Sequence, residues 1–191
     1  SIFLNNLTNN NGRLNYKGKL ENRSRVKFST IDNFDQFEPE IVFDKEDIIF
    51  FNNNGSIIKF DRYSELIWKK NFYTKIERKL KPMITFGNNK KILIAADNLA
   101  KYYALDIESG QLLWMKNNTA PFNSQIKIYK DKFFIIDFDN ILRCYSLKNG
   151  NEIWNVKTDT TFIKSQKKLS VIILDNYVYF NNSIGDISAI D

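Results

Sequence analysis

Short apolar runs separated by turn-forming residues dominate positions 40–191 of the chain. The runs are rich in Ile, Phe, Tyr and Val and alternate with clusters of Asn, Asp, Gly and Lys, a pattern typical of β-strands joined by tight turns. The sequence shows no long apolar stripe with the helical period of about 3.6 residues. We predict strands at 40–43, 47–51, 56–61, 66–72, 83–86, 91–97, 101–106, 112–116, 125–129, 132–138, 141–146, 152–156, 170–175, 177–181 and 186–191.

This strand pattern repeats along the chain. Each repeat has an anchor residue at the end of its third strand, and successive anchors are 45, 40 and 45 residues apart: Asp61, Asp106, Ser146 and Asp191. All three tryptophans follow an anchor by 7 or 8 residues: Trp68, Trp114 and Trp154. All three prolines precede an anchor by 22 to 25 residues: Pro39, Pro82 and Pro121. Two rare residue types in one register indicate a true internal repeat.

Four strands in each period of 40–45 residues are typical of a β-propeller blade. The sequence therefore predicts an all-β protein made of four-stranded antiparallel blades, about four of them. Blade 1 spans 39–73, blade 2 spans 82–117, blade 3 spans 121–157, and an incomplete blade 4 spans 168–191. We expect these blades, which occupy positions 36–191, to belong to a larger, eight-bladed ring.

An Asn-rich segment, residues 1–35, precedes the blades. It contains only two short strand-like runs, at 2–4 and 25–28. The segment is therefore either partly disordered or contributes a strand that closes another blade. In the second case the chain would form a four-bladed ring by itself.

The second repeat carries the clearest motif, which runs from Ala104 to Trp114. It resembles the A-x-D-x-x-T-G-x-x-x-W tryptophan-docking repeat of the quinoprotein, or PQQ-like, β-propellers, with Ser109 in place of Thr. Gly110 permits a positive φ in the turn between the third and fourth strands, and Asp106 can accept hydrogen bonds from the backbone of that turn. The small Ala104 leaves room for the indole of Trp114, which packs one blade against the next.

The third repeat keeps Gly150 and Trp154, with Cys144 at the small position and Ser146 at the Asp position. We interpret Cys144 as a small buried hydrophobic residue rather than a nucleophile or ligand. The fourth repeat reaches its anchor at Asp191.

The first repeat departs most from the motif. It keeps Asp61 and Trp68, but Lys59 stands at the small position, its turn has no glycine, and that turn is one residue shorter. We therefore expect a looser tryptophan dock in blade 1 than in the other blades.

Composition narrows the possible chemistry. The chain has no histidine and a single cysteine, which excludes Ser-His-Asp and Cys-His catalysis, histidine metal sites and internal disulfides. The formal charge is +6, but the chain has 22 Lys and only 6 Arg together with 25 Asn and 25 Ile, as expected from an AT-rich coding sequence. We therefore predict no nucleic-acid partner, and we interpret the basic stretch 69–81 as a solvated loop.

The PQQ-like resemblance leaves two functional classes. Quinone-dependent dehydrogenases of this type need a calcium ion, acidic ligands in the central funnel and, in many members, a vicinal cysteine pair, which this chain lacks. Two acidic pairs, Asp137 with Asp139 and Glu38 with Glu40, have the spacing that places both side chains on one strand face. We interpret them as solvated carboxylates at strand ends, and we predict no catalytic, cofactor or metal site.

The non-catalytic class includes the BamB-like propeller lipoproteins of the machinery that assembles outer-membrane β-barrel proteins, and the chain resembles this group most. The resemblance implies an interaction scaffold with β-barrel assembly components as its protein partners, no small-molecule substrate and no cofactor. It also implies a periplasmic location, at most peripheral to the outer membrane. The alternative is a fragment of a quinone-dependent dehydrogenase propeller.

Overall fold

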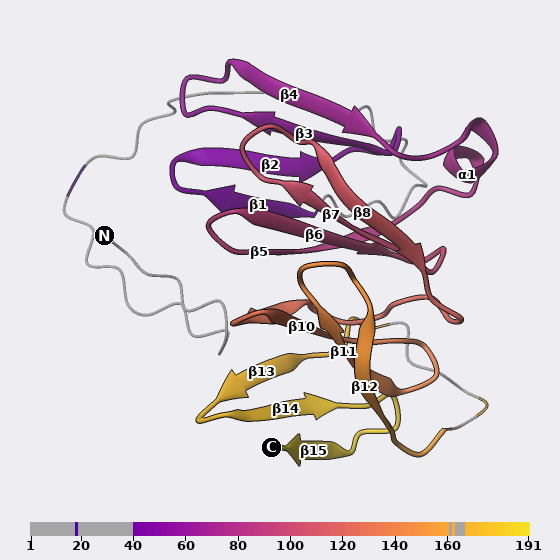
Figure 1. Ribbon diagram of the computed structural model, residues 1–191. Coiled ribbons are helices and arrows are strands. Elements are labelled where there is room, and N and C mark those ends of the chain that lie inside the picture. The colour runs from indigo at the N-terminus through magenta and orange to yellow at the C-terminus, as the bar shows by residue number, and fades with distance from the viewer. Residues whose placement is uncertain (1–17, 19–39, 161, 163–166) are drawn as a thin grey trace.

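The computed structural model describes residues 18, 40–160, 162 and 167–191, which fold into four antiparallel β-sheets (Figure 1). The first sheet contains β1 (Ile41–Asp44), β2 (Asp47–Phe51), β3 (Ser56–Phe60) and β4 (Leu66–Asn71). The second contains β5 (Ile84–Asn88), β6 (Ile92–Asp97), β7 (Lys101–Asp106) and β8 (Leu112–Asn117). The third contains β9 (Lys127–Tyr129), β10 (Lys132–Ile136), β11 (Ile141–Ser146) and β12 (Glu152–Lys157). The fourth contains β13 (Val171–Leu174), β14 (Tyr177–Asn181) and β15 (Ile187–Ile190).

Each sheet is one sequence repeat, and its strands pair with their neighbours in chain order. The prediction of an all-β fold built of four-stranded antiparallel blades is confirmed, and the described residues form a partial propeller of three four-stranded blades and one three-stranded blade. The prediction made for residues 1–35 concerns positions that, apart from Gly18, lie outside the described residues.

A register shift recurs between the third and fourth strands of the three four-stranded blades. It lies after Lys59 in blade 1, after Ala104 in blade 2 and after Cys144 in blade 3. Just before this shift, each of these residues is paired directly opposite the tryptophan of its own blade. The irregularity therefore fixes how the anchor turn and the indole are placed relative to each other.

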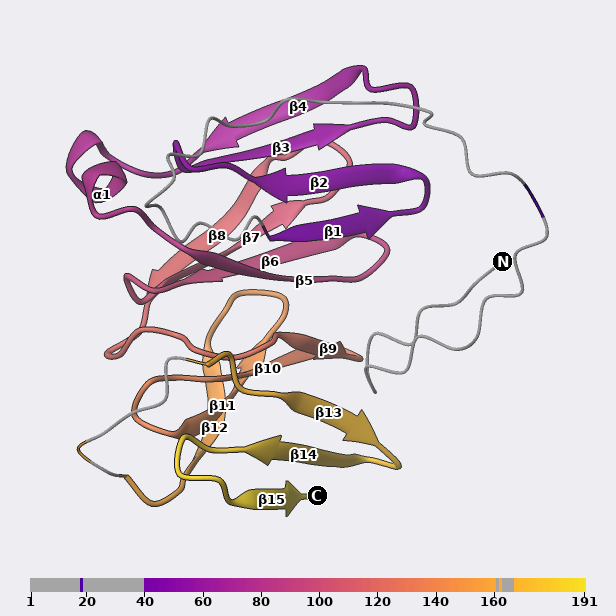
Figure 2. The ribbon, with the colours of Figure 1, turned by 180° about the vertical axis from the view of Figure 1, so that it is seen from behind.

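The hydrophobic core consists of three layers, each between two neighbouring blades. Alternate residues of the middle strands supply the two faces: Ile49 and Phe51 of β2 pack toward blade 2, whereas Phe134 and Ile136 of β10 pack toward blade 4. The first strands β1, β5, β9 and β13 follow one another along the inner side of the stack (Figure 2). This is the propeller arrangement, in which sheets pack face to face around an axis.

One connection differs from its prediction. The stretch 69–81, interpreted as a solvated loop, contains a short helix, α1 (Lys75–Lys79), which has no buried residue. Thr74 caps its N-terminus: the Thr74 hydroxyl accepts a hydrogen bond from the amide of Glu77, and the Glu77 carboxylate accepts one from the amide of Thr74. This reciprocal capping box stabilises a helix that is otherwise too short to persist.

Candidate functional site

The tryptophans of blades 1 and 2 lie against the anchor turn of the following blade. The indole Nε1 of Trp68 donates to the carbonyl of Ile107 at 3.2 Å, and that of Trp114 donates to the carbonyl of Leu147 at 3.1 Å. Each indole lies on a glycine with a positive φ, +68° at Gly110 and +69° at Gly150. A Cβ at Gly150 would lie only 2.6 Å from the Trp114 ring, so these glycines also provide the space that the indoles occupy.

Trp154 lies in a different environment. It is half-buried, packs against Phe134 with ring centroids 5.8 Å apart, and is paired opposite the fully buried Cys144. Burial raises the pKa of the Cys144 thiol to about 11, so the thiol stays protonated at neutral pH. The interpretation of Cys144 as a small buried residue is confirmed.

The anchor residues organise their own turns. Asp106 accepts hydrogen bonds from the hydroxyl of Ser109 at 2.6 Å and from its amide at 2.8 Å, and these bonds lower the pKa of Asp106. Asp61 accepts from two amides of its shorter turn, and Ser146 closes its turn through its backbone carbonyl, which accepts from the amide of Gly150. The last anchor, Asp191, follows β15 and is exposed.

The expected looseness of the first dock is wrong. Trp68 is buried, at 7% exposure, whereas Trp114 and Trp154 are only half-buried. In the missing glycine's place, Ser64 adopts a φ of +69°, so the shorter turn keeps the left-handed residue. Lys59 is fully buried and reaches a set of oxygen atoms, so it does not displace the indole.

These oxygens surround the Lys59 ammonium at the boundary of blades 1 and 2. Its Nζ lies 2.7 Å from Asp44, 3.1 Å from Asp47 and 3.5 Å from Glu108, and it donates to the Ile107 carbonyl at 3.2 Å. Burial lowers the pKa of Lys59, but hydrogen bonds to Asp44 and Asp47 outweigh this effect and raise the pKa above its ordinary value. Lys59 is thus a charged link between the blades.

Four further residues form a repeated set that the motif analysis missed. Each is buried where the second strand ends and the turn to the third strand begins, and its side-chain oxygen accepts hydrogen bonds from two backbone amides: Asn52, Asp97, Asp137 and Asn182. Their spacing of 45, 40 and 45 residues equals that of the anchors, and this second register is the signal that could have revealed them. Asx residues in such turns replace backbone hydrogen bonds that the turn cannot make.

The interpretation of Asp137 as a solvated carboxylate is wrong. Asp137 is fully buried, and its Oδ2 accepts from the Nε of Arg143 at 2.7 Å. Arg143 extends the pair by donating to Glu152 at 2.6 Å. Glu40 is also paired, with the Lys168 ammonium at 3.0 Å, whereas Glu38 lies outside the described residues. Asp137 tolerates full burial because the Arg143 cation compensates its charge.

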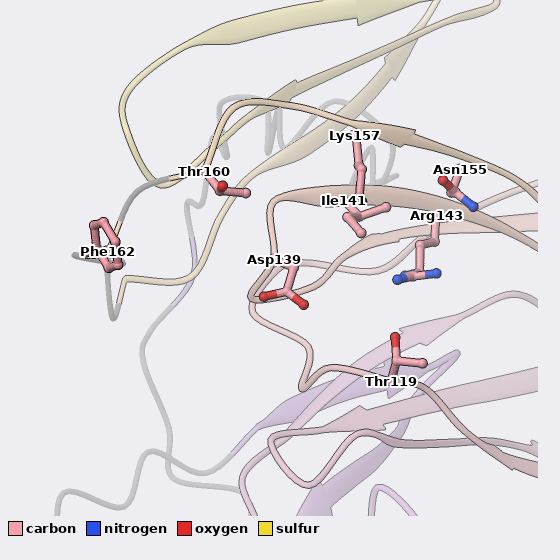
Figure 3. Close-up of a pocket in the computed structure, with 8 residues that line it drawn as sticks. All are labelled: Thr119, Asp139, Ile141, Arg143, Asn155, Lys157, Thr160 and Phe162. Carbon is pink, nitrogen blue, oxygen red and sulfur yellow. The ribbon is translucent and has the colours of Figure 1, made fainter.

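A groove with a volume of about 850 Å³ opens between blades 2 and 3 (Figure 3). Arg143 lies in it, with Asn155 and Lys157 of β12 on one side and Thr119 of the blade 2–3 connection opposite. Asp139 borders the same space. Because Arg143 is already paired with two carboxylates, the groove offers mixed hydrogen-bonding groups rather than one strong charge.

A second cavity, of about 730 Å³, lies where the inner strands begin. Glu40 and Lys168 line it, together with Thr85, Asn98 and Phe122. The Glu40–Lys168 ion pair joins blade 1 to the segment that enters blade 4. Within the described ranges, no group of three His, Cys, Asp or Glu side chains is placed to hold a metal ion.

Comparisons with known proteins establish the family. A model of the family described as outer membrane protein assembly factor BamB matches residues 53–191. The chain belongs to this family of PQQ-like, BamB-type propellers. The resemblance predicted from the motif is thereby confirmed. A comparison with curated protein sequences finds no match.

Solved structures show the same fold. BamB from Moraxella catarrhalis aligns with a TM-score of 0.68 at 18% identity, covering 80% of this chain and 45% of that protein. The chain therefore spans less than half the length of the Moraxella BamB. Two computationally designed proteins also align: Ika4 with a TM-score of 0.64 at 13% identity, covering 87% and 98% of the two chains, and Ika8 with 0.65 at 12%, covering 85% and 48%. In the part of the chain that the structure describes, no helix is long and apolar enough to span a membrane.

Proposed function

We propose that the chain acts as a non-catalytic protein-interaction scaffold in the assembly of outer-membrane proteins, as part of a BamB-like propeller. The observation that carries this proposal is the family match over residues 53–191. The proposal places the chain in the periplasm, peripheral to the outer membrane, with components of the β-barrel assembly machinery as its partners.

The motif residues support a scaffold role because the structure uses them for packing. The indoles of Trp68 and Trp114 and the glycines that they cover lie between blades, and Asp106 is bound within its own turn. The groups with unusual surroundings, such as Lys59 and Asp137, are buried in ion pairs rather than directed into a cavity. Contacts with a partner would therefore involve the loops, the outer strands and the groove between blades 2 and 3.

The groove is the surface that we assign to a partner polypeptide. Its side chains include both donors and acceptors, and the outer strand β12 lies at its edge with Asn155 and Lys157 exposed. A bound peptide needs hydrogen-bonding groups of both kinds along its length, which this lining supplies.

Binding to the purified periplasmic part of the β-barrel assembly channel protein from the same organism tests the proposal. We expect a saturable complex in an immobilised-chain assay, weakened by Lys157→Glu and unchanged by Lys90→Glu, which alters an exposed lysine in a turn of blade 2. Absence of a complex at high micromolar concentration would contradict the scaffold role.

The non-catalytic part of the proposal has a separate test. Pyrroloquinoline quinone with Ca²⁺ should leave the melting temperature and the absorption spectrum of the cofactor unchanged. A raised melting temperature together with a shifted chromophore would instead indicate a quinone-dependent propeller.

A further inference from the structure

The connection between blades 1 and 2 is longer than the repeat requires. Ten residues (72–81) separate β4 from Pro82, whereas only three (118–120) separate β8 from the equivalent Pro121. The additional residues form α1, which projects from the edge of the sheets in both views (Figures 1 and 2). The shorter blade 2–3 connection therefore shows how many residues the fold needs to join two blades.

The two connections differ in how far they bury their apolar residues, since the blade 1–2 connection buries Tyr73 at 7% exposure but leaves the apolar residues at its helix exposed. Between blades 2 and 3 they are buried at 5–6% exposure: Ala120, Phe122 and Ile126. By contrast, Ile76 of α1 is 75% exposed, and Leu80, the C-cap residue just after α1, is 60% exposed. These two side chains are four residues apart and lie on the same side of the helix. Single exposed apolar residues are common in this chain, but these two lie side by side at a helix that projects from the sheets.

The charges of the two connections differ as well. Positions 118–126 contain no charged residue, whereas positions 72–83 contain four cations and one anion. Among the described residues, no carboxylate lies within ion-pair distance of Lys75, Arg78 or Lys79. Within the part of the chain that the structure describes, the apolar pair is thus flanked by three cations, Lys75, Arg78 and Lys79, that have no carboxylate in ion-pair distance.

The inner side of the connection is firmly held. Glu77 pairs with the Lys101 ammonium at 2.6 Å, and the hydroxyl of Tyr73 donates to the buried Asp97 at 2.7 Å. Lys101 also donates to the carbonyl of Phe72 at 3.2 Å. Glu77 faces the sheets, and an α-helix turns by about 100° per residue, so Lys75 and Lys79 point away from the sheets. Ile76 and Leu80 lie beside these two lysines.

We propose that this set, the α1 patch (Lys75, Ile76, Arg78, Lys79 and Leu80), binds an anionic phospholipid surface. Apolar side chains that enter the headgroup region, flanked by cations that contact the lipid phosphates, are the combination found in interfacial helices. The patch consists of five side chains, whereas a stable protein interface involves about 20–30 residues and about 800 Å² on each partner. A membrane surface needs no complementary pocket, so it is the occupant that fits.

Sedimentation of the full 191-residue chain with vesicles tests this binding. We expect partitioning onto vesicles of phosphatidylglycerol and phosphatidylcholine, decreasing with salt, and little partitioning onto phosphatidylcholine alone. Each cation near an anionic surface contributes about five-fold to binding, so K75Q/R78Q/K79Q should weaken it about 100-fold. I76S/L80S should weaken binding about ten-fold.

The matched control is K90Q/K91Q/K148Q, which removes the same charge from exposed turns of blades 2 and 3. It should retain most of the binding, and all variants should melt like the parent chain because they alter exposed side chains. Equal loss in the control would show a net-charge effect and overturn the proposal. Failure of the parent chain to bind anionic vesicles would overturn it as well and leave a protein as the occupant, without affecting the scaffold test on the groove.

Discussion

The two blade interfaces that contain complete docks share the indole hydrogen bond and the glycine beneath the ring, and they differ in the side chains around them. In both, an indole N–H donates to the carbonyl that follows the anchor of the next blade, that of Ile107 or Leu147. Around Trp68 the interface is ionic, because Lys59 links the blades. Around Trp114 it is aromatic, and Tyr102 donates to the carbonyl of Gly150 at 3.0 Å.

This difference shows which part of the repeat is fixed by geometry. The indole–carbonyl contact depends on strand register and turn conformation, which the blades share. The space opposite the indole can be filled by Ala104, with aromatic rings nearby, or by Lys59 with carboxylates of both blades. The repeat therefore tolerates different side chains wherever the interface can compensate their charge.

Removing Trp68 should have the largest effect on the first interface. Trp68→Ala should lower the free energy of unfolding by about 3–5 kcal/mol, because it empties a buried site and leaves the Ile107 carbonyl with fewer donors. Trp154→Ala should cost about half as much, since that indole is half-buried. Urea unfolding monitored by circular dichroism measures both. Equal costs would contradict the ranking of the docks.

Removing the charge of Lys59 tests how much the ionic interface between blades 1 and 2 contributes to stability. Lys59→Met should cost about 3 kcal/mol, because Asp44 stays buried without its cation. Adding Asp44→Leu should recover most of that loss, since an apolar pair replaces a buried ion pair. A double variant that is less stable than Lys59→Met would rule out the ion pair as the cause.

Lys59 also predicts how the stability of the chain depends on pH. Its pKa in the folded chain is raised above the ordinary value of 10.5, so the stability it contributes is present below that pH and is lost as pH rises through the folded pKa. Urea midpoints of the parent chain should therefore fall more steeply above about pH 10.5 than those of Lys59→Met. Parallel midpoints for the two chains would show that Lys59 is not stabilised as a cation.

The turn glycines allow a test of the aromatic interface around Trp114. Gly150→Ala should cost about 2 kcal/mol, because its Cβ would overlap the Trp114 ring and because φ is positive there. Gly185→Ala is the matched control: φ is also positive, but no atom lies within 4 Å of the added Cβ. Thermal melting of both variants separates steric overlap from backbone strain, and equal losses would assign the whole effect to strain.

The smallest effect is expected at the first anchor turn. Ser64→Gly should stabilise the chain by about 1 kcal/mol or less, because Ser64 adopts a left-handed conformation that glycine accepts without strain. The change makes blade 1 more like its neighbours. A lower urea midpoint for Ser64→Gly would show that the Ser64 side chain stabilises the turn.

The sequence alone determined the blades, their strands and the anchor turns. Strand periodicity and the common register of Trp, Pro and Asp are local or repeated properties, and they remain visible even in the degenerate first repeat. The spacing of Asn52 and Asp97 by one repeat is equally visible in the sequence. A buried Asn or Asp, however, cannot be distinguished from a surface turn residue by its identity alone.

Only the tertiary structure decided which groups are buried and what they meet. Lys59 pairs with Glu108, 49 positions away, and Trp68 reaches the backbone of the next blade. Asp137 is fully buried, with its carboxylate paired to Arg143 of the neighbouring strand β11. Such contacts depend on how the sheets stack, since the energy of a buried charge is set by its partners in space rather than by its position in a repeat.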